Sequence, residues 1–134
     1  MESLDTLPQY TISLPLAIKL GKKVYSINLN GYRNWHYRLS NDLKKAYKAY
    51  IKESVALLPK LNKISLTYIV YARSARRFDT MNVISITSKF FEDALVEANK
   101  IEDDNYDFIP EHHSYFGGIR KTNPRVDVII KEIE

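Results

Sequence analysis

The sequence predicts a small single-domain α/β protein with a mixed β-sheet and two main helices. Its 134 residues suit one domain, and 45% of them are hydrophobic, which is enough for a core. Alternating, β-branched segments predict strands near both ends of the chain, and two long segments have helical periodicity. We therefore expect the order β-β-α-β-α-(β)-β in one domain over residues 1–134, with a flexible N-terminus over 1–9.

The first strands are expected before residue 31. Residues 10–16, "YTISLPL", alternate as a strand that ends at Pro15, and Gly21 marks a turn. Residues 23–30 predict a second extended segment, which can form a hairpin with the first. Residues 31–39, "GYRNWHYRL", have no clean period, so we expect a loop that leads into a helix.

The clearest helix follows in "SNDLKKAYKAYIKESVALLPK". Ser40 or Asn41 can cap it, because a short side-chain oxygen accepts free N–H groups of the first turn. Pro59 disfavours helix at Leu58 and marks its end. Apolar residues at helical spacing predict the buried side, namely Leu43, Ala46, Tyr47, Tyr50, Ile51, Val55 and Leu58. The lysines fall elsewhere and predict a solvated basic side.

The second half of the chain predicts a strand, a helix, a loop and a final strand. Residues 63–73 are apolar enough for a central strand. A helix is expected from about Thr80 to about Asn99, and residues 102–124 are expected to be mostly loop. The buried face of this helix is predicted to hold Val83, Thr87, Phe90, Phe91, Ala94 and Ala98. Residues 125–133, "RVDVIIKEI", alternate in their first half and predict the last strand.

Composition and charge narrow the function classes. The chain has no cysteine, which excludes disulfides and thiolate metal sites and favours a reducing compartment. No apolar run reaches the length of a membrane span, and the N-terminus lacks the pattern of a signal peptide, so we expect a cytoplasmic protein without a membrane partner. Residues 1–60 hold ten Lys or Arg against four Asp or Glu, whereas residues 61–134 hold ten against twelve. A basic half favours polyanions such as nucleic acid, although a slightly basic soluble surface has the same composition.

The stretch "RRFDTMNVISITSKFFEDALVEANKIEDDN" carries the candidate chemistry. On a helical wheel, Asn82, Lys89 and Asp93 fall within about 40° of one another and away from the packed face. Mg²⁺ prefers oxygen ligands and needs only a few carboxylates, so Asp79 and Asp104 are candidate ligands if the fold brings them together. Lys89 would then stabilise developing charge on a phosphate, and nearby arginines would hold neighbouring phosphates, namely Arg73, Arg76 and Arg77.

Each of these residues also has an ordinary structural interpretation. Asp79 can be a helix N-cap, and Asp93 can pair with Lys89 one turn away. Asp103, Asp104 and Asn105 together are typical of a turn. Both interpretations remain open at this point.

One part of the chain resembles a known family. The segment "KFFEDALVEANKIEDDN" resembles the core of the RusA family of Holliday-junction resolvases, with Lys89, Asp93-Ala94-Leu95 and Asp103-Asp104 at the family spacing. The preceding "ARRFDTMN" resembles the arginine-rich lead-in to the family's first acidic residues. "SINLNGYRNWHYRLSNDLKKAYK" and "GGIRKTNPRVDVIIKE" resemble further segments of phage members, so that the likeness spans roughly residues 10–132.

The resemblance implies a RusA-like fold and a Mg²⁺-dependent endodeoxyribonuclease that resolves four-way junctions or other branched DNA by paired nicks. It implies a homodimer, Mn²⁺ as a substitute metal, and a phage protein in the bacterial cytoplasm that acts in DNA recombination and repair. By this resemblance, the catalytic residues would be Asp79, Lys89 and Asp104. The metal ligands would be Asp79, Asp104 and Asp103, and the site would be supported by Asn82 and Asp93. The sequence departs from the family at Met81, which stands where a second aspartate is usual, and the segment before Lys89 is about one helical turn longer.

The remaining candidates are residues that could contact DNA. His36 lies beside Arg33, Asn34 and Trp35, a mixture that suits base stacking or phosphate contact, although a capping loop with Trp35 in the core fits equally well. The lysines of the first helix, Lys44 and Lys48 among them, can line a DNA channel or form a solvated face. His112 and His113 are adjacent and would point apart on extended backbone, so we do not expect them to bind one ion together.

Two rival functions remain beside the nuclease. The first is a RusA-like relative that binds DNA junctions without cutting them. The second is a small interaction protein that has no nucleic-acid role. Salt-dependent binding to DNA would exclude the second, because counterions compete with phosphate contacts.

Overall fold

The structure is a computed structural model that describes residues 8–133. Residues 1–7, most of the predicted flexible N-terminus, lie outside the described residues, whereas residue 9 already belongs to a strand. The elements are β1 (Gln9–Leu14), β2 (Ala17–Leu20), β3 (Lys23–Ser26), α1 (Leu29–Asn34), α2 (Tyr37–Ala56), β4 (Ile64–Ala72), α3 (Thr80–Glu97), β5 (Glu111–Ile119) and β6 (Arg125–Glu132).

The main sheet has four strands in the order β1-β6-β4-β5. β6 pairs antiparallel with both β1 and β4, whereas β4 and β5 are parallel and are connected through α3. β2 and β3 form a separate two-stranded sheet that turns at Gly21, where φ is 65°. The predicted α/β class with a mixed sheet is therefore confirmed.

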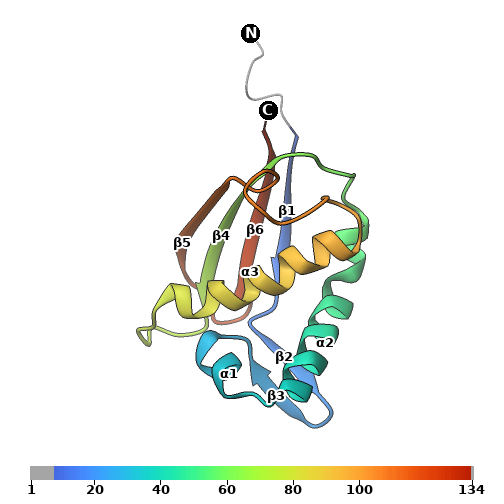
Figure 1. Ribbon diagram of the computed structural model, residues 1–134. Helices are drawn as coiled ribbons and strands as arrows, with labels where there is room; N and C mark the ends of the chain where they lie inside the picture. Colours follow the sequence, from blue (N-terminus) through green and yellow to red (C-terminus); the bar gives the residue numbers. More distant parts are fainter. Residues whose placement is uncertain (1–7, 134) are drawn as a thin grey trace.

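Both long helices lie on the same face of the main sheet (Figure 1). α3 crosses that face, and the C-terminal half of α2 runs beside it. Alternate residues of β4 and β6 are buried beneath the helices, because successive side chains of a strand point to opposite faces. Within residues 8–133, no helix is both long enough and apolar enough to cross a membrane.

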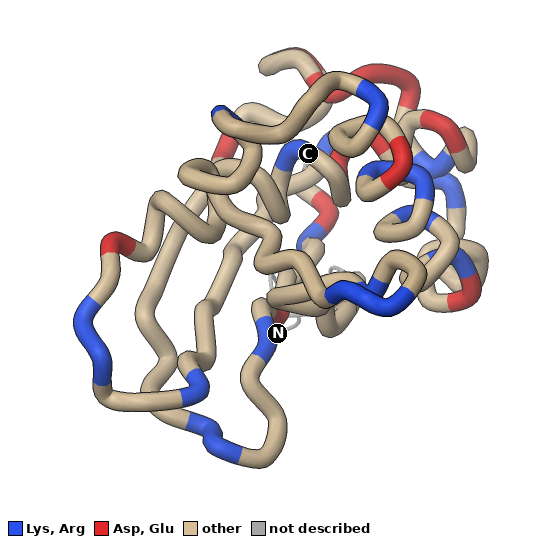
Figure 2. The backbone as a smooth tube through the Cα atoms, turned by 90° about the horizontal axis from the view of Figure 1, so that it is seen from below, with Lys and Arg blue, Asp and Glu red and all other residues tan. Residues whose placement is uncertain are grey.

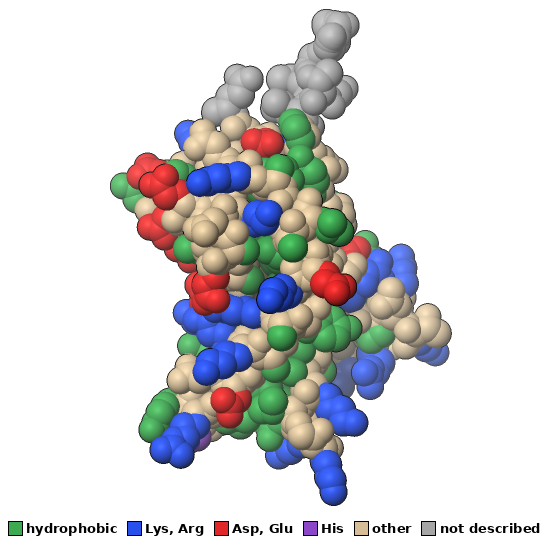
Figure 3. Space-filling model, turned by 90° about the vertical axis from the view of Figure 1, so that its right-hand side faces the viewer, with side chains coloured by type: hydrophobic (Ala, Val, Ile, Leu, Met, Phe, Trp, Pro, Cys, Tyr) green, Lys and Arg blue, Asp and Glu red, His purple; other side chains and the backbone are tan. Residues whose placement is uncertain are grey.

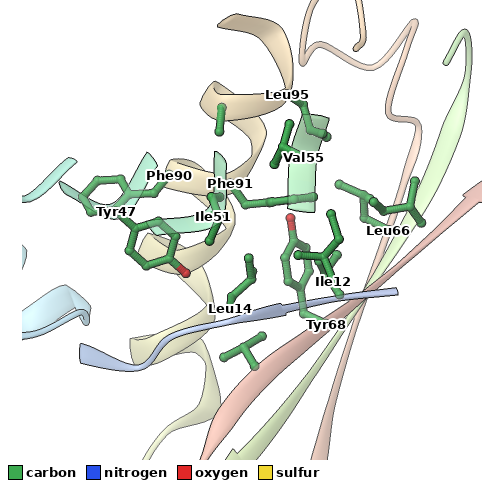
Figure 4. Packing of buried hydrophobic residues seen from close by; sticks show 14 of the residues in the cluster. Ile12, Leu14, Tyr47, Ile51, Val55, Leu66, Tyr68, Phe90, Phe91 and Leu95 are labelled. Atoms are coloured by element: carbon green, nitrogen blue, oxygen red, sulfur yellow. The ribbon is translucent and has the colours of Figure 1, made fainter. Parts of the chain in front are cut away.

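The core forms where α2, α3 and the sheet meet. Aromatic side chains fill its centre, with Tyr47 from α2, Phe90 and Phe91 from α3, and Tyr68 from β4 all almost fully buried (Figure 4). Tyr47 and Phe90 meet edge to face with ring centroids 5.4 Å apart, a favourable arrangement for aromatic rings. The predicted buried side of α2 is confirmed at Leu43, Tyr47, Ile51 and Val55, whereas Tyr50 is exposed.

Five local expectations were wrong. Residues 111–119 form strand β5 rather than loop, and α1 occupies part of the predicted loop 31–39. α2 begins before Ser40, because the side chain of His36 caps it by accepting from the N–H of Arg38 at 3.2 Å. β1 pairs with β6 instead of forming a hairpin with residues 23–30. On α3, Ile84, Ile86 and Leu95 are buried, whereas the predicted core residue Ala98 is exposed.

A bulge shapes the end of β5 that lies next to the carboxyl end of β4. The register shifts between Val70 and Tyr71, so that Gly117 is the extra residue between the partners of these two positions. A Cβ atom at Gly117 would lie 2.5 Å from the ring of Tyr71, which explains why glycine is needed there. The bulge leaves Phe116 opposite Val70, beside the loop that leads into α3.

Candidate nucleic-acid interface

An open cleft of about 860 Å³ lies at the carboxyl end of β4. Its walls come from the β4–α3 loop, from α1 and from the first turns of α3. Val70 and Ala72 contribute from the end of β4, and Leu16, Ile27 and Val83 add further apolar side chains. The cleft therefore lies where residues 16–33 and residues 70–85, which are far apart in the sequence, come together.

Four arginines line this cleft. Arg73, Arg76 and Arg77 come from the β4–α3 loop, and Arg33 comes from α1. All four are exposed, and none of the ion pairs found within residues 8–133 involves them. Their guanidinium groups are thus available to an anion, and arginine suits phosphate because it presents several N–H donors in a rigid plane.

Hydrogen bonds hold the walls of the cleft in place. Asn28 caps α1 by accepting from the N–H of Gly31 at 2.8 Å. The N–H of Asn30 donates to the side-chain oxygen of Asn82 at 3.2 Å, which ties α1 to the first turn of α3. Asp79 caps α3 by accepting from the N–H of Met81 at 3.0 Å. The alternative interpretation of Asp79 as an N-cap is therefore confirmed.

The cleft belongs to a basic end of the molecule. Figure 2 views this end, where Lys and Arg lie on several of the loops. Arg120 and Arg125 approach the ring of Tyr71, with distances of 5.1 and 4.3 Å from each guanidinium carbon to the ring centroid. On the face shown in Figure 3, acidic side chains gather mainly over the upper part and basic ones mainly over the lower part. Positive charge is therefore concentrated towards the end of the molecule to which the cleft belongs.

Asp79 and Asp104 do not meet within one chain. Asp79 precedes α3 and lies in the cleft, at the carboxyl end of β4. Asp104 follows α3 in a segment that is bound to the start of β4, where the carbonyl of Phe108 accepts from the N–H of Ile64 at 2.8 Å. β4 has nine residues, so its two ends are about 26 Å apart. Two ligands of one Mg²⁺ need oxygens within about 4 Å of each other. The two acids therefore do not meet on one ion within a single chain, and a Mg²⁺ or Mn²⁺ site stays a prediction from the resemblance.

The acidic turn after α3 has a structural role. The Asp103 carboxylate accepts from the N–H of Asp104 at 2.7 Å and from the side-chain amide of Asn105 at 3.0 Å. The interpretation of Asp103, Asp104 and Asn105 as a turn is therefore confirmed. Within residues 8–133, no three His, Asp or Glu side chains are grouped so that they could hold a metal ion.

Two of the three polar residues aligned on α3 contact the other helices. Asn82 bonds to α1, and Asp93 pairs with Lys44 of α2 at 2.7 Å rather than with Lys89. Lys89 is exposed, but it lies ten residues after Asp79, which corresponds to about 15 Å along a helix. Lys89 therefore does not join Asp79 in one site, and Asn82 and Asp93 serve to position helices.

Several of the other predicted DNA-binding residues already have partners within the protein. Lys48 pairs with Glu97 of α3, so both predicted lysines of α2 already have acidic partners. His36 caps α2, and its ring lies 4.5 Å from that of Tyr37, while Trp35 packs against the core. The capping interpretation of this loop is therefore confirmed. Of the predicted DNA-binding residues, Arg33, Arg73, Arg76 and Arg77 are the ones that converge on the cleft.

The sequence interpretation missed a buried polar cluster around Glu92. Its carboxylate accepts from the hydroxyl of Tyr68 at 2.7 Å and lies 3.0 Å from Nε2 of His112. Burial raises the pKa of Glu92, the bonds with Tyr68 and His112 lower it, and the charge of Asp104 raises it again. Helical spacing could have shown that Glu92 is on the buried face of α3, because it lies eight residues after Ile84 and three before Leu95, which are both buried.

The comparisons with known proteins add no assignment. No model of a known protein family matches the chain, and no curated protein matches it. The resemblance to the RusA family remains a prediction from sequence.

Proposed function

We propose that this protein binds DNA through the arginine-lined cleft at its basic end. The observation that carries the proposal is the convergence of Arg33, Arg73, Arg76 and Arg77, from two separate segments, without acidic partners in the described chain. Branched DNA is the expected class of substrate, which follows from the resemblance to junction resolvases and not from the cleft itself.

The physical basis of the proposal is the release of counterions. DNA carries closely spaced phosphates with condensed cations, and each arginine that neutralises a phosphate sets cations free. Arginines that already pair with acids gain little from such an exchange, because they lose one partner as they acquire another. Within residues 8–133, the arginines of the cleft have no such partner to lose, whereas Lys44 and Lys48 do.

Binding is better supported than cutting. The predicted ligands Asp79 and Asp104 lie near opposite ends of β4, so no catalytic step is assigned to them. Asp79 does lie in the cleft, and its observed role there is to cap α3. Cutting of branched DNA and a homodimer stay predictions from the resemblance. A nicking assay on a four-way junction with Mg²⁺ or Mn²⁺ tests the first, and sedimentation tests the second.

The proposal is tested by the salt dependence of binding to a labelled four-way junction. The Arg76→Ala/Arg77→Ala variant is expected to weaken binding and to reduce the slope of log K against log salt by about 2, since each lost phosphate contact removes about 1. Lys52→Ala/Lys60→Ala is the matched control, because it removes the same charge from exposed positions that do not line the cleft. An equal change in both variants would show that net charge alone drives binding, and no salt-dependent binding by the wild type would overturn the proposal.

A further inference from the structure

Two exposed aromatic side chains stand beside the arginines. Phe78 lines the cleft and directly follows Arg77, and Phe116 projects from β5. Their rings meet edge to face with centroids 6.1 Å apart, yet Phe78 is 39% exposed and Phe116 is 54% exposed. Met81, which is 50% exposed, lines the same part of the cleft. Three large apolar groups therefore face solvent next to a cationic surface.

The lining of the cleft is also partly apolar. Leu16, Ile27, Val70, Ala72 and Val83 contribute to it together with the arginines. An intact duplex presents phosphates to such a surface, but its bases are stacked on each other and cannot reach an apolar wall. A strand with unpaired bases can place phosphates on arginines and a base against aromatic rings at the same time.

We infer that the cleft takes unpaired nucleotides of a DNA strand, with phosphates held by Arg73, Arg76 and Arg77 and a base stacked on Phe78 and Phe116. The inference rests on the proposed function, because it specifies which form of DNA the same arginines bind. Side-chain amides of Asn28, Asn30 and Asn82 also line the cleft and offer hydrogen-bonding groups to base edges. Unpaired nucleotides occur at branch points and in single strands, so both classes of DNA present this chemistry.

The test compares three probes by fluorescence anisotropy or competition: oligothymidylate, a duplex of the same length, and thymidine monophosphate. The wild type is expected to bind oligothymidylate more tightly than the duplex, although the duplex carries more charge. Equal or tighter binding to the duplex would overturn the inference and leave the proposed function standing. Monophosphate that competes as well as the oligomer would show a site for free nucleotides instead of a strand. No binding to any DNA would remove the proposed function itself.

Variants separate stacking from charge. Phe78→Leu/Phe116→Val keeps apolar side chains, and valine suits a strand, but neither residue offers a ring. Its affinity for oligothymidylate is expected to fall by about tenfold or more, while duplex binding stays unchanged. Tyr106→Ala is the matched control, because Tyr106 is 81% exposed in the acidic loop after α3. Equal losses on both probes, or no loss on oligothymidylate, would overturn the inference.

Ultraviolet cross-linking provides a readout that does not depend on the stability of the variants. Oligothymidylate cross-linked to the wild type is expected to label peptides that contain Phe78 or Phe116. Labelling confined to peptides of α2 would place the strand away from Phe78 and Phe116 and overturn the inference.

Discussion

The hydrogen bond between Tyr68 and Glu92 allows a quantitative test of the core. Glu92 is the only buried charged residue among residues 8–133. The hydroxyl of Tyr68 lies 2.7 Å from its carboxylate. Tyr68→Phe removes this donor and leaves the carboxylate with the partly exposed His112 as its remaining side-chain partner. A hydrogen bond to a charged group contributes about 1.5–3 kcal/mol to stability, so we expect a loss of that size at pH 7.5.

The expected change in melting temperature follows from the size of the chain. For 134 residues at about 2.1 cal/mol/K each, the entropy of unfolding is about 0.28 kcal/mol/K. A loss of 1.5–3 kcal/mol then corresponds to about 5–11 °C. Thermal unfolding followed by circular dichroism measures this shift. In the Glu92→Gln background the partner is neutral, and the same Tyr68→Phe change is expected to cost only about 0.5–1.5 kcal/mol. An equal cost in both backgrounds would refute the hydrogen-bond explanation and assign the loss to packing.

The raised pKa of Glu92 gives this cluster a defined pH dependence. Burial is the largest cause, and it holds the pKa of the folded state above the ordinary value of 4.5. Between that value and the folded pKa, the folded state binds more protons than the unfolded state, so this group adds stability as pH falls. Relative to Glu92→Gln, the wild type is therefore expected to gain stability on acidification towards pH 4.5 and then to level off. A relative loss over the same window would contradict the raised pKa.

Two further variants separate structural from DNA-binding roles. Asp79→Asn keeps a side chain that can cap α3 and removes a negative charge from the cleft. The affinity for the junction, measured by titration, is therefore expected to rise by about 1.5- to 5-fold. A fall would indicate that the carboxylate itself helps to bind DNA. Lys44→Ala breaks the pair with Asp93 and is expected to lower the free energy of unfolding, measured with denaturant, by at most about 1 kcal/mol. DNA affinity is expected to stay within about twofold of the wild type. A large loss of affinity would show that Lys44 belongs to the DNA interface.

The strands that were predicted best are those in which buried and exposed residues alternate. β4 and β6 were expected within one or two residues, because their buried residues follow a period of two. β5 gave no such signal, since residues 111–116 are all exposed on an edge strand that pairs only with β4. Its formation depends on pairing across the crossover through α3, and local sequence does not encode that partner. The same limit explains β1, whose partner β6 lies at the other end of the chain.

The candidate site was predicted in part. The arginines before α3 were predicted from their place beside the candidate acidic residues, but the cleft also needs α1, which meets α3 through the bond from Asn30 to Asn82. α1 has six residues and none of them is buried, so periodicity could not reveal it. Asp79 and Asp104 do not meet within one chain, because α3 is a continuous helix of 18 residues that carries the chain away from Asp79 before it reaches Asp104.

The uneven distribution of charge described above has a consequence for the kinetics of association. A molecule with cations around one end and many of its acids towards the other experiences a torque in the field of a polyanion. It would turn its arginine-bearing end towards DNA before contact, so that fewer encounters are wasted in wrong orientations. Added salt would shorten the range of this alignment and slow association more than it changes the lifetime of complexes held by stacked rings.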